Sequence, residues 1–431
     1  MTNRIPTMLF SFILGLVLAP SLVAEDKTKK EEKSVIQAVV GATVLPVSGP
    51  MVRRGTVTWK DGKILEVAAE LPAPEGATVY NGEGLYVCPG FVSVVASGVG
   101  IETSSGNIGN GLDPWDRELG IALANGITTI QVLPAPFFGG FGQDGPLYGG
   151  GNSAIIKLTR GDLAGMLVRE PAMNYFSLPT RQRELNYFLL RERFKQAKEY
   201  IEKRAKAAAR TPKVAIPKLS SSLKLYVAVL ENKRPTIFSP SNNHEVGIVL
   251  SLSREYGFDA VLNEPKDAWM MAADLAAANV PVLVKSRGPD FDFNTTGPLF
   301  EKGQMAPVRR AAAFAKAGCL LSILPYRRGI SLSGLAGRDL ATLHIDAAFA
   351  VRGGMNNEEA LKAITLNPAR TLRVDDRLGS LDKGKDADLL ILSGHPLDYR
   401  SFVLKAFING KLYYDRKKSR IYREIPLTGD K

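Results

Sequence analysis

Three histidines, His244, His344 and His395, are the first residues to consider for chemistry, because neutral imidazole is both a general base and a transition-metal ligand. No two of them have the spacing of neighbouring metal ligands on one helix or strand. They are also the complete histidine content of the 431-residue chain. We therefore interpret each as a structural residue.

The sequence gives little support for nucleophilic catalysis either. The sequence contains no Gly-x-Ser-x-Gly elbow, and neither Cys88 nor Cys319 has a histidine near it along the chain. Both cysteines lie in apolar, strand-like stretches. They are predicted to be buried thiols rather than part of a disulfide framework.

Carboxylates leave two alternatives open. Glu264, Asp290 and Asp292 could supply oxygen ligands to a hard cation, or two of them could act as the acid and base of a glycosidase. A solvated loop at 288–297 is the competing interpretation. The Gly-rich loop 134–151 carries Phe137, Phe138 and Phe141 and is interpreted either as a lid or as a simple linker.

The elements that would position these residues alternate between short apolar runs and helical patterns. The apolar runs are 91–96, 127–133, 154–158, 236–238, 260–262, 280–284 and 320–324, and the helical stretches include 114–125, 245–256, 266–278 and 304–317. Fully apolar strands that alternate with helices are typical of parallel strands buried on both faces. The fold class is therefore α/β, and the number of units favours a closed (β/α)₈ barrel.

Short strands and turns replace this pattern at both ends of the chain. We predict one discontinuous β-sandwich domain from residues 35–87 and 384–418, with the barrel spanning 88–383 and a basic tail at 419–431.

The amino terminus resembles an export signal. Arg4, an apolar core at 8–18 and Ala24 predict a signal peptide over residues 1–24, followed by a charged tether at 25–34. The protein is expected to be periplasmic or extracellular and to have no transmembrane span once the signal is removed; an uncleaved anchor is the alternative. The net charge of +12 favours acidic partners, but no nucleic-acid-binding signature accompanies it.

Four segments resemble the amidohydrolase superfamily, in particular its imidazolonepropionase-like branch. They are GEGLYVCPGF (82–91), LANGITTIQVL (123–133), NEEALKAITLNPARTL (357–372) and DDRLGSLDKGKDADLLIL (375–392). The resemblance implies a barrel enzyme that activates water on zinc or another divalent metal, and homo-oligomers are common among such barrels.

The resemblance also implies where the metal ligands should lie, and the sequence departs from the pattern at those places. Val95 and Ser97 occupy the two strand-one histidine positions, Ser239 the strand-five position and Asn263 the strand-six position. Ser93 takes the place of a strand-one aspartate, and no acid occurs near Leu324, where the strand-eight aspartate is expected. These side chains are poor transition-metal ligands, so no cofactor is predicted.

We expect the barrel mouth to be polar and to bind a small polar or anionic ligand. Three functions remain open: a pseudoenzyme that binds such a ligand, a hydrolase of cyclic amides or dipeptides with a rebuilt site, and a surface-associating protein that uses the basic helix 181–210. The candidate ligand-binding residues are Ser93, Ser97, Ser239, Ser241, Asn242, His244, Asn263, Glu264, Arg327 and Arg328.

Overall fold

The structure is a computed structural model, and it covers most of the chain after the predicted tether. It describes residues 35–96, 99–101, 107–133, 149–150, 153–178, 183–210, 215–216, 218–231, 234–265, 267–287, 305–326, 343–420 and 423–424. The predicted signal peptide and tether, most of the predicted lid or linker at 134–151, the predicted loop 288–297 and most of the basic tail lie outside these residues.

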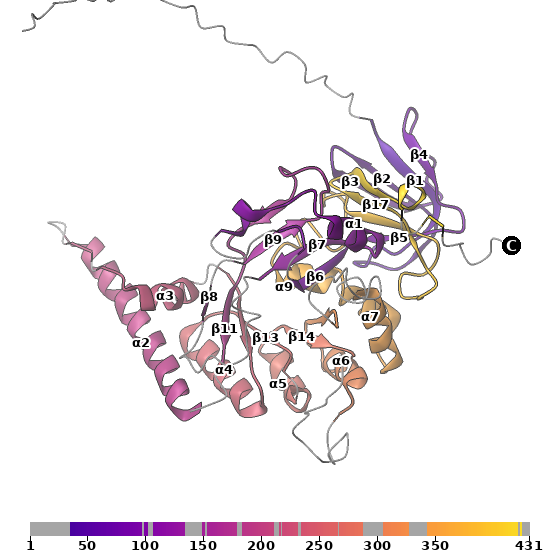
Figure 1. The fold of residues 1–431 in the computed structure, drawn as a ribbon. Coiled ribbons are helices and arrows are strands. Elements are labelled where there is room, and N and C mark those ends of the chain that lie inside the picture. The colour runs from indigo at the N-terminus through magenta and orange to yellow at the C-terminus, as the bar shows by residue number, and fades with distance from the viewer. Residues whose placement is uncertain are drawn as a thin grey trace, which may run out of the picture. The chain divides into compact units, whose positions relative to one another are not determined.

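The two ends of the chain form one eight-stranded sheet, as predicted for the composite β domain (Figure 1). Its strands are β1 (Gln37–Val44), β2 (Val52–Lys60), β3 (Lys63–Ala69), β4 (Thr78–Asn81), β5 (Tyr86–Pro89), β16 (Leu389–Leu392), β17 (Val403–Ile408) and β18 (Lys411–Asp415). The order is β18-β17-β16-β5-β1-β2-β3, with β4 beside β1. Antiparallel pairing of β16 with β5 joins the two ends. In the core of this sheet, the Trp59 indole N–H donates to the Gly410 carbonyl at 3.1 Å, and the ring packs edge-on against Phe407.

The middle of the chain forms a barrel of short strands. They are β6 (Phe91–Ala96), β7 (Ile127–Val132), β8 (Gly149–Gly150), β9 (Ala154–Lys157), β10 (Leu167–Arg169), β11 (Asn174–Ser177), β12 (Thr236–Ser239), β13 (Ala260–Asn263), β14 (Val282–Lys285) and β15 (Leu321–Leu324). Strands β6 and β7 are parallel, and so are β11 to β15. Val92, Ile237 and Leu283 belong to one apolar cluster to which most of these strands contribute. The interior is therefore packed rather than hollow, as in other barrels of this class.

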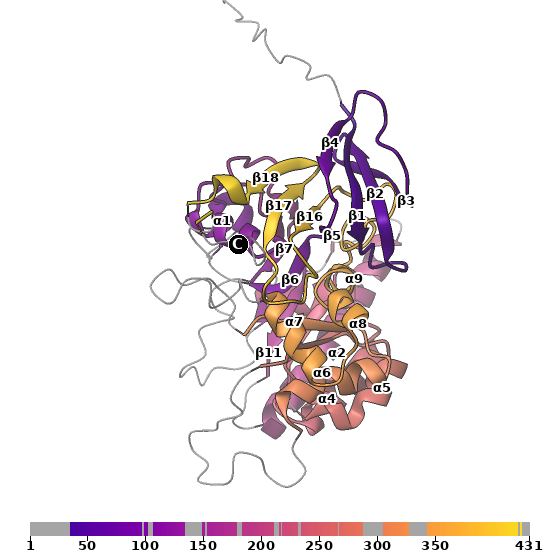
Figure 2. The ribbon, with the colours of Figure 1, turned by 90° about the vertical axis from the view of Figure 1, so that its right-hand side faces the viewer.

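Helices cover the outside of the barrel (Figures 1 and 2). They are α1 (Arg117–Ala124), α2 (Arg183–Ala208), α3 (Lys224–Leu230), α4 (Asn243–Tyr256), α5 (Ala272–Ala277), α6 (Pro307–Lys316), α7 (Leu343–Arg352), α8 (Asn357–Lys362) and α9 (Leu366–Thr371), with 3₁₀ turns at Ile108–Gly111, Ser221–Leu223, Ala268–Met271 and Arg416–Lys418. Phe176 and Phe238, on β11 and β12, stack with their ring centroids 5.2 Å apart and belong to the cluster that packs under these helices. The predicted helices at 114–125, 245–256 and 304–317 thus correspond to α1, α4 and α6.

The direction of strand β9 differs from the prediction. The apolar run 154–158 was expected to be parallel, but Lys157 pairs with Thr129 and Ala154 with Val132 in an antiparallel ladder. β10 then pairs antiparallel with β9. A parallel neighbour needs a crossover connection, whereas the described chain turns from β9 back into β10 as a hairpin. An apolar run by itself carries no information about strand direction.

Backbone groups from the turn between α8 and α9 bridge β6 and β15. The Val92 N–H, on β6, donates to the Ile364 carbonyl at 2.8 Å, and the Ile323 N–H, on β15, donates to the Ala363 carbonyl at 2.9 Å. Strand-to-strand pairing between β6 and β15 does not occur among the described residues. The turn at 363–364 therefore links the first and last barrel strands, and we call it the seam turn.

A buried ion cluster ties the barrel to the sheet. The Lys157 ammonium, on β9, is 1% exposed and contacts Asp386 and Asp388 at 2.8 Å each and the Asn409 side-chain oxygen at 2.6 Å. Burial alone would raise the pKa of Asp386, but Lys157, Lys63 and Arg377 lower it to about 2. Burial raises the pKa of Asp388 despite the same lysine. We call Lys157, Asp386, Asp388 and Asn409 the Lys157 cluster.

Candidate functional site

Three neighbouring parallel strands end in polar residues, as the carboxyl ends of barrel strands do at catalytic mouths. These residues are Ser239 on β12, Asn263 on β13 and Lys285 on β14. The Asn263 amide donates to the Ser239 hydroxyl at 3.0 Å. The Lys285 ammonium forms an ion pair with Glu264 at 2.9 Å, and both of these side chains are close to 30% exposed.

Asn263 presents an acceptor that nothing in the described part of the chain satisfies. The residue is 3% exposed, and its side-chain oxygen has no hydrogen-bond donor among the described residues. Beside it, Glu264 has a φ of 51°, a conformation that is unfavourable for a residue other than glycine and that tends to concentrate at functional sites. The mouth therefore combines an ammonium donor with an amide acceptor.

A second ion pair lies at the ends of β14 and β15. The Arg287 guanidinium bonds to the carboxylate of Asp346, on α7, at 2.6 Å, and the same carboxylate accepts the Tyr326 N–H at 3.1 Å. The guanidinium also lies over the rings of Tyr326 and Phe349, at 5.5 and 5.3 Å from their centroids. Asp346 is fully buried, so its carboxylate anchors α7 and is not exposed to a ligand.

Asp346 is the residue near this mouth that the sequence analysis missed. An acid was sought at the end of β15 itself, near Leu324, whereas Asp346 reaches the Tyr326 backbone from a helix twenty residues further along the chain. No local spacing in the sequence signals such a return.

Two of the predicted binding residues instead form the start of α4. The Asn242 side chain accepts the Glu245 N–H at 3.0 Å, and the Glu245 carboxylate accepts the Ser241 N–H at 2.6 Å. The arrangement resembles a capping box, except that the Glu245 carboxylate accepts the N–H of the residue before the N-cap Asn242. His244 follows on the exposed surface and packs edge-on against Tyr187.

The strand-one positions are apolar or enclosed. Val95 is fully buried in the cluster that fills the barrel, and Ser93 is also fully buried, with its hydroxyl donating to the Val95 carbonyl at 3.3 Å. Ser97, Arg327 and Arg328 lie outside the described residues, so their predicted roles remain predictions.

These donors do not fit a transition-metal site. Ser239 and Asn263 bond to each other, Val95 offers no lone pair, and hydroxyl and amide oxygens are poor ligands for zinc. Across the described ranges, no group of three or more histidine, cysteine, aspartate or glutamate side chains is placed to hold a metal ion.

His344, His395 and the two cysteines have other surroundings in the described part of the chain. Burial, and secondarily Arg287, lowers the pKa of His344 to about 4, and its ring stacks on Phe91. The His395 ring nitrogen, between β16 and β17 of the eight-stranded sheet, accepts the Leu397 N–H. Burial raises the pKa of Cys319 to about 11 and raises that of Cys88 further, which confirms both as buried free thiols and disfavours the thiolate that nucleophilic catalysis needs.

Comparisons with known proteins agree with the fold and with the motifs. A model of the Amidohydrolase family matches residues 328–417. An imidazolonepropionase from Thermoplasma volcanium is 40% identical over 70 residues, which cover 15% of this chain and 17% of that protein. The matched segments thus span less than a fifth of the length of the curated relatives.

Solved structures extend the likeness to most of the chain. The crystal structure of an amidohydrolase from Thermotoga maritima MSB8 superposes with a TM-score of 0.70 at 24% identity, covering 88% of this chain and 100% of that one. Phenylurea hydrolase B gives 0.53 at 17% identity, covering 91% and 100%. At these identities the likeness establishes the barrel with its attached sheet and does not establish an activity.

Proposed function

Because the chain belongs to the amidohydrolase family, we propose that it is a non-hydrolytic member that binds a small polar or anionic ligand at the mouth of its barrel. The observation that carries this proposal is the hydrogen bond between Ser239 and Asn263. These two residues stand where metal-binding histidines are expected, and their hydroxyl and amide groups, which bond to each other, are poor ligands for a transition metal. The family's water-activating chemistry has no donor set at these positions.

The ligand's chemistry follows from two polar groups at the strand ends, the partly exposed Lys285 ammonium and the buried Asn263 oxygen. Lys285 supplies a cationic donor, and the Asn263 oxygen supplies an acceptor. A small molecule that bears a carboxylate and an N–H group would pair with both, and a charge-assisted bond to the ammonium would contribute most of the affinity. Glu264 would then lose its ion pair with Lys285, and water would solvate its carboxylate instead.

Export belongs to the same proposal. The predicted signal peptide at 1–24 supports a periplasmic or extracellular location. Within the part of the chain that the structure describes, no helix has both the length and the apolarity needed to cross a bilayer. The basic helix α2 gives weaker support to a surface-associating role, because Glu192, Glu199 and Glu202 interrupt its lysines and arginines.

Metal content tests the non-hydrolytic part of the proposal. We expect tag-free protein, exposed to Zn²⁺, Mn²⁺ and Fe²⁺ and then dialysed, to retain less than about a tenth of an equivalent of any metal, because oxygen donors without imidazole hold these ions weakly. Elemental mass spectrometry measures the content. A stoichiometric metal that survives dialysis would refute the proposal and support a hydrolase with a rebuilt site.

A ligand-observed NMR titration with N-acetylglycine tests the binding part. This probe carries one carboxylate and one N–H, and we expect its binding to weaken about tenfold in Lys285→Met, since one charge-assisted hydrogen bond is lost. Lys195→Met, on the exposed face of α2, removes the same charge and should leave binding unchanged. The same spectra report hydrolysis: release of acetate and glycine by the wild-type protein would favour the rival hydrolase, and equal binding by both variants would exclude the mouth as the site.

A further inference from the structure

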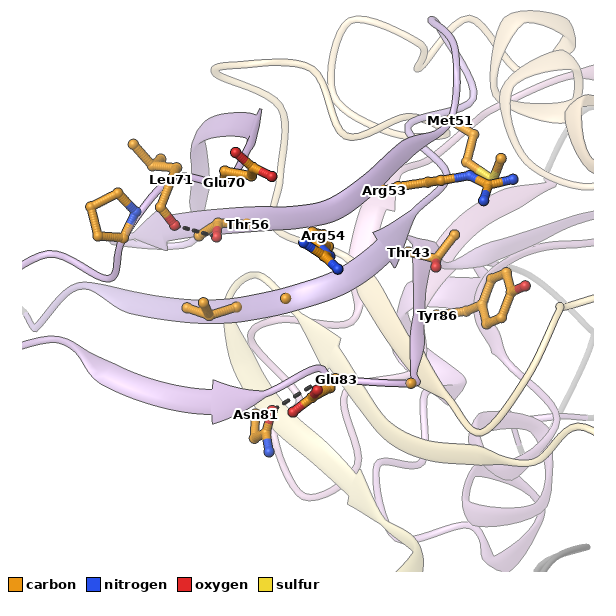
Figure 3. A pocket seen from close by; sticks show the side chains of 14 residues that line it. Thr43, Met51, Arg53, Arg54, Thr56, Glu70, Leu71, Asn81, Glu83 and Tyr86 are labelled. Carbon is orange, nitrogen blue, oxygen red and sulfur yellow. Dashed lines mark hydrogen bonds between the residues drawn. The ribbon is translucent and has the colours of Figure 1, made fainter.

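The eight-stranded sheet carries a groove that the barrel mouth does not explain. It encloses about 800 Å³, within the size range of ligand sites (Figure 3). Its floor is the middle of β1, one wall is β2 with the segment 70–72, and the other wall is the segment 81–86. All of these residues lie on strands of the sheet or on the segments that connect them, so this groove is independent of the proposed mouth ligand.

Local irregularities in the backbone open this groove. The pairing of β1 with β2 shifts register between Val39 and Ala42, where Gly41 has a φ of 80°. A bulge of this kind bends a strand and redirects its side chains. On the opposing strand Arg54 has a φ of 47°, and its carbonyl accepts the Glu70 N–H at 3.0 Å. The Thr56 hydroxyl holds the wall in place by donating to the Leu71 carbonyl at 2.5 Å.

Charged side chains of both signs line the groove and are not engaged with each other. Arg53 and Arg54 are exposed, and neither guanidinium has a hydrogen bond or an ion pair within the described residues. Glu70 and Glu83 are also exposed, on opposite walls. A guanidinium presents a planar fork of donors that matches a carboxylate, while carboxylate side chains accept hydrogen bonds from hydroxyl groups.

Apolar surface completes the lining. Met51 is 44% exposed at one end of the groove, and the ring of half-buried Tyr86 lies near the same end (Figure 3). Leu71 and Pro72 flank the other end. These groups offer contact area to C–H surfaces, and their separation along the groove suits an elongated ligand rather than a single ion.

From this lining we propose that the groove binds an acidic oligosaccharide, with sugar carboxylates on Arg53 and Arg54 and hydroxyl groups on Glu70 and Glu83. An acidic oligosaccharide carries carboxylates, hydroxyl groups and apolar ring faces. These groups match the arginines, the glutamates and the apolar residues of the lining. The net charge of +12 adds long-range attraction toward acidic polymers.

Isothermal titration with trigalacturonate tests this proposal. The test variant is Arg53→Gln combined with Arg54→Asn, because asparagine tolerates the left-handed backbone at position 54 and so removes the charge without adding strain. We expect wild-type protein to bind the trisaccharide and the double variant to bind it at least about tenfold more weakly, since two charge-assisted contacts are lost. Maltotriose, which lacks carboxylates, should bind no better to wild-type protein than to the double variant.

The matched control is Lys195→Gln combined with Lys198→Gln, which removes the same net charge from exposed positions on α2. It should retain wild-type affinity for trigalacturonate. Equal weakening in both double variants would show general charge attraction and overturn the proposal, and so would undetectable binding by the wild-type protein. A triglutamate peptide that binds as tightly as trigalacturonate would overturn the assignment to a saccharide.

Discussion

Replacing Lys157 by methionine is expected to lower the free energy of unfolding by about 3–5 kcal/mol, the cost of leaving buried charge without its partner. The Lys157 ammonium is the cation that Asp386 and Asp388 share in the interior, and methionine fills its volume without its charge. Within the described residues, the Asp388 carboxylate would keep the hydrogen bond from the Asn409 N–H, at 2.7 Å. Urea denaturation followed by tryptophan fluorescence measures the loss, because Trp59 lies in the sheet that this cluster anchors.

Lys63→Met is the matched control for this effect. Lys63 bonds to the same Asp386 at 2.6 Å, but its side chain is 48% exposed. Its removal should cost less than about 1 kcal/mol, because water solvates and screens an exposed partner. Similar losses for Lys63→Met and Lys157→Met would show that the cluster contributes through general charge balance, contrary to our expectation.

Arg287→Met should be the second most damaging substitution, with an expected loss of about 2–4 kcal/mol. Asp346 is fully buried, and removal of the guanidinium takes away the cation that pairs with its carboxylate, which also accepts the Tyr326 N–H. The expected loss is smaller than for Lys157 because Arg287 is 25% exposed, so water can replace part of the interaction. The same urea denaturation assay measures it.

Two further variants distinguish loss of the ion pair from loss of packing as the cause of this destabilisation. Arg287→Met combined with Asp346→Asn should recover part of the stability, because the buried negative charge that lost its guanidinium disappears with the aspartate. Lys285→Met breaks the neighbouring ion pair, whose members are both close to 30% exposed, and should cost less than about 1 kcal/mol. If the Asp346→Asn combination restored nothing, the contribution of Arg287 would lie in its packing on Tyr326 and Phe349.

Much of the fold could be predicted from periodicity. Apolar runs and helical spacing located β12, β13, α1, α4 and α6, since burial on both faces of a strand or on one face of a helix leaves a pattern in the sequence. The direction of β9 could not be predicted, because direction depends on the connection rather than on the strand's own residues. The seam turn was also hidden, since it acts through backbone groups that every residue possesses.

The candidate site was only partly predictable. The resemblance located Ser239 and Asn263 at neighbouring strand ends, and the structure brings them into hydrogen-bond contact. Ser241 and Asn242 had the right polarity but cap α4, a role that polar residues before a helix commonly have. Asp346 and the sheet groove depend on contacts between segments far apart in the chain, for which one sequence gives no local signal.

The position of the seam turn affects how the chain's ancestry should be interpreted. The stretch matched by the family model, 328–417, contains the seam turn, both aspartates of the Lys157 cluster, and all of β16, β17 and β18. These parts close the barrel and fasten it to the sheet, so they are needed for folding whether or not any reaction takes place. A descendant could lose every catalytic group and still inherit this scaffolding almost unaltered. Likeness confined to this stretch therefore traces descent and does not transfer an enzymatic activity.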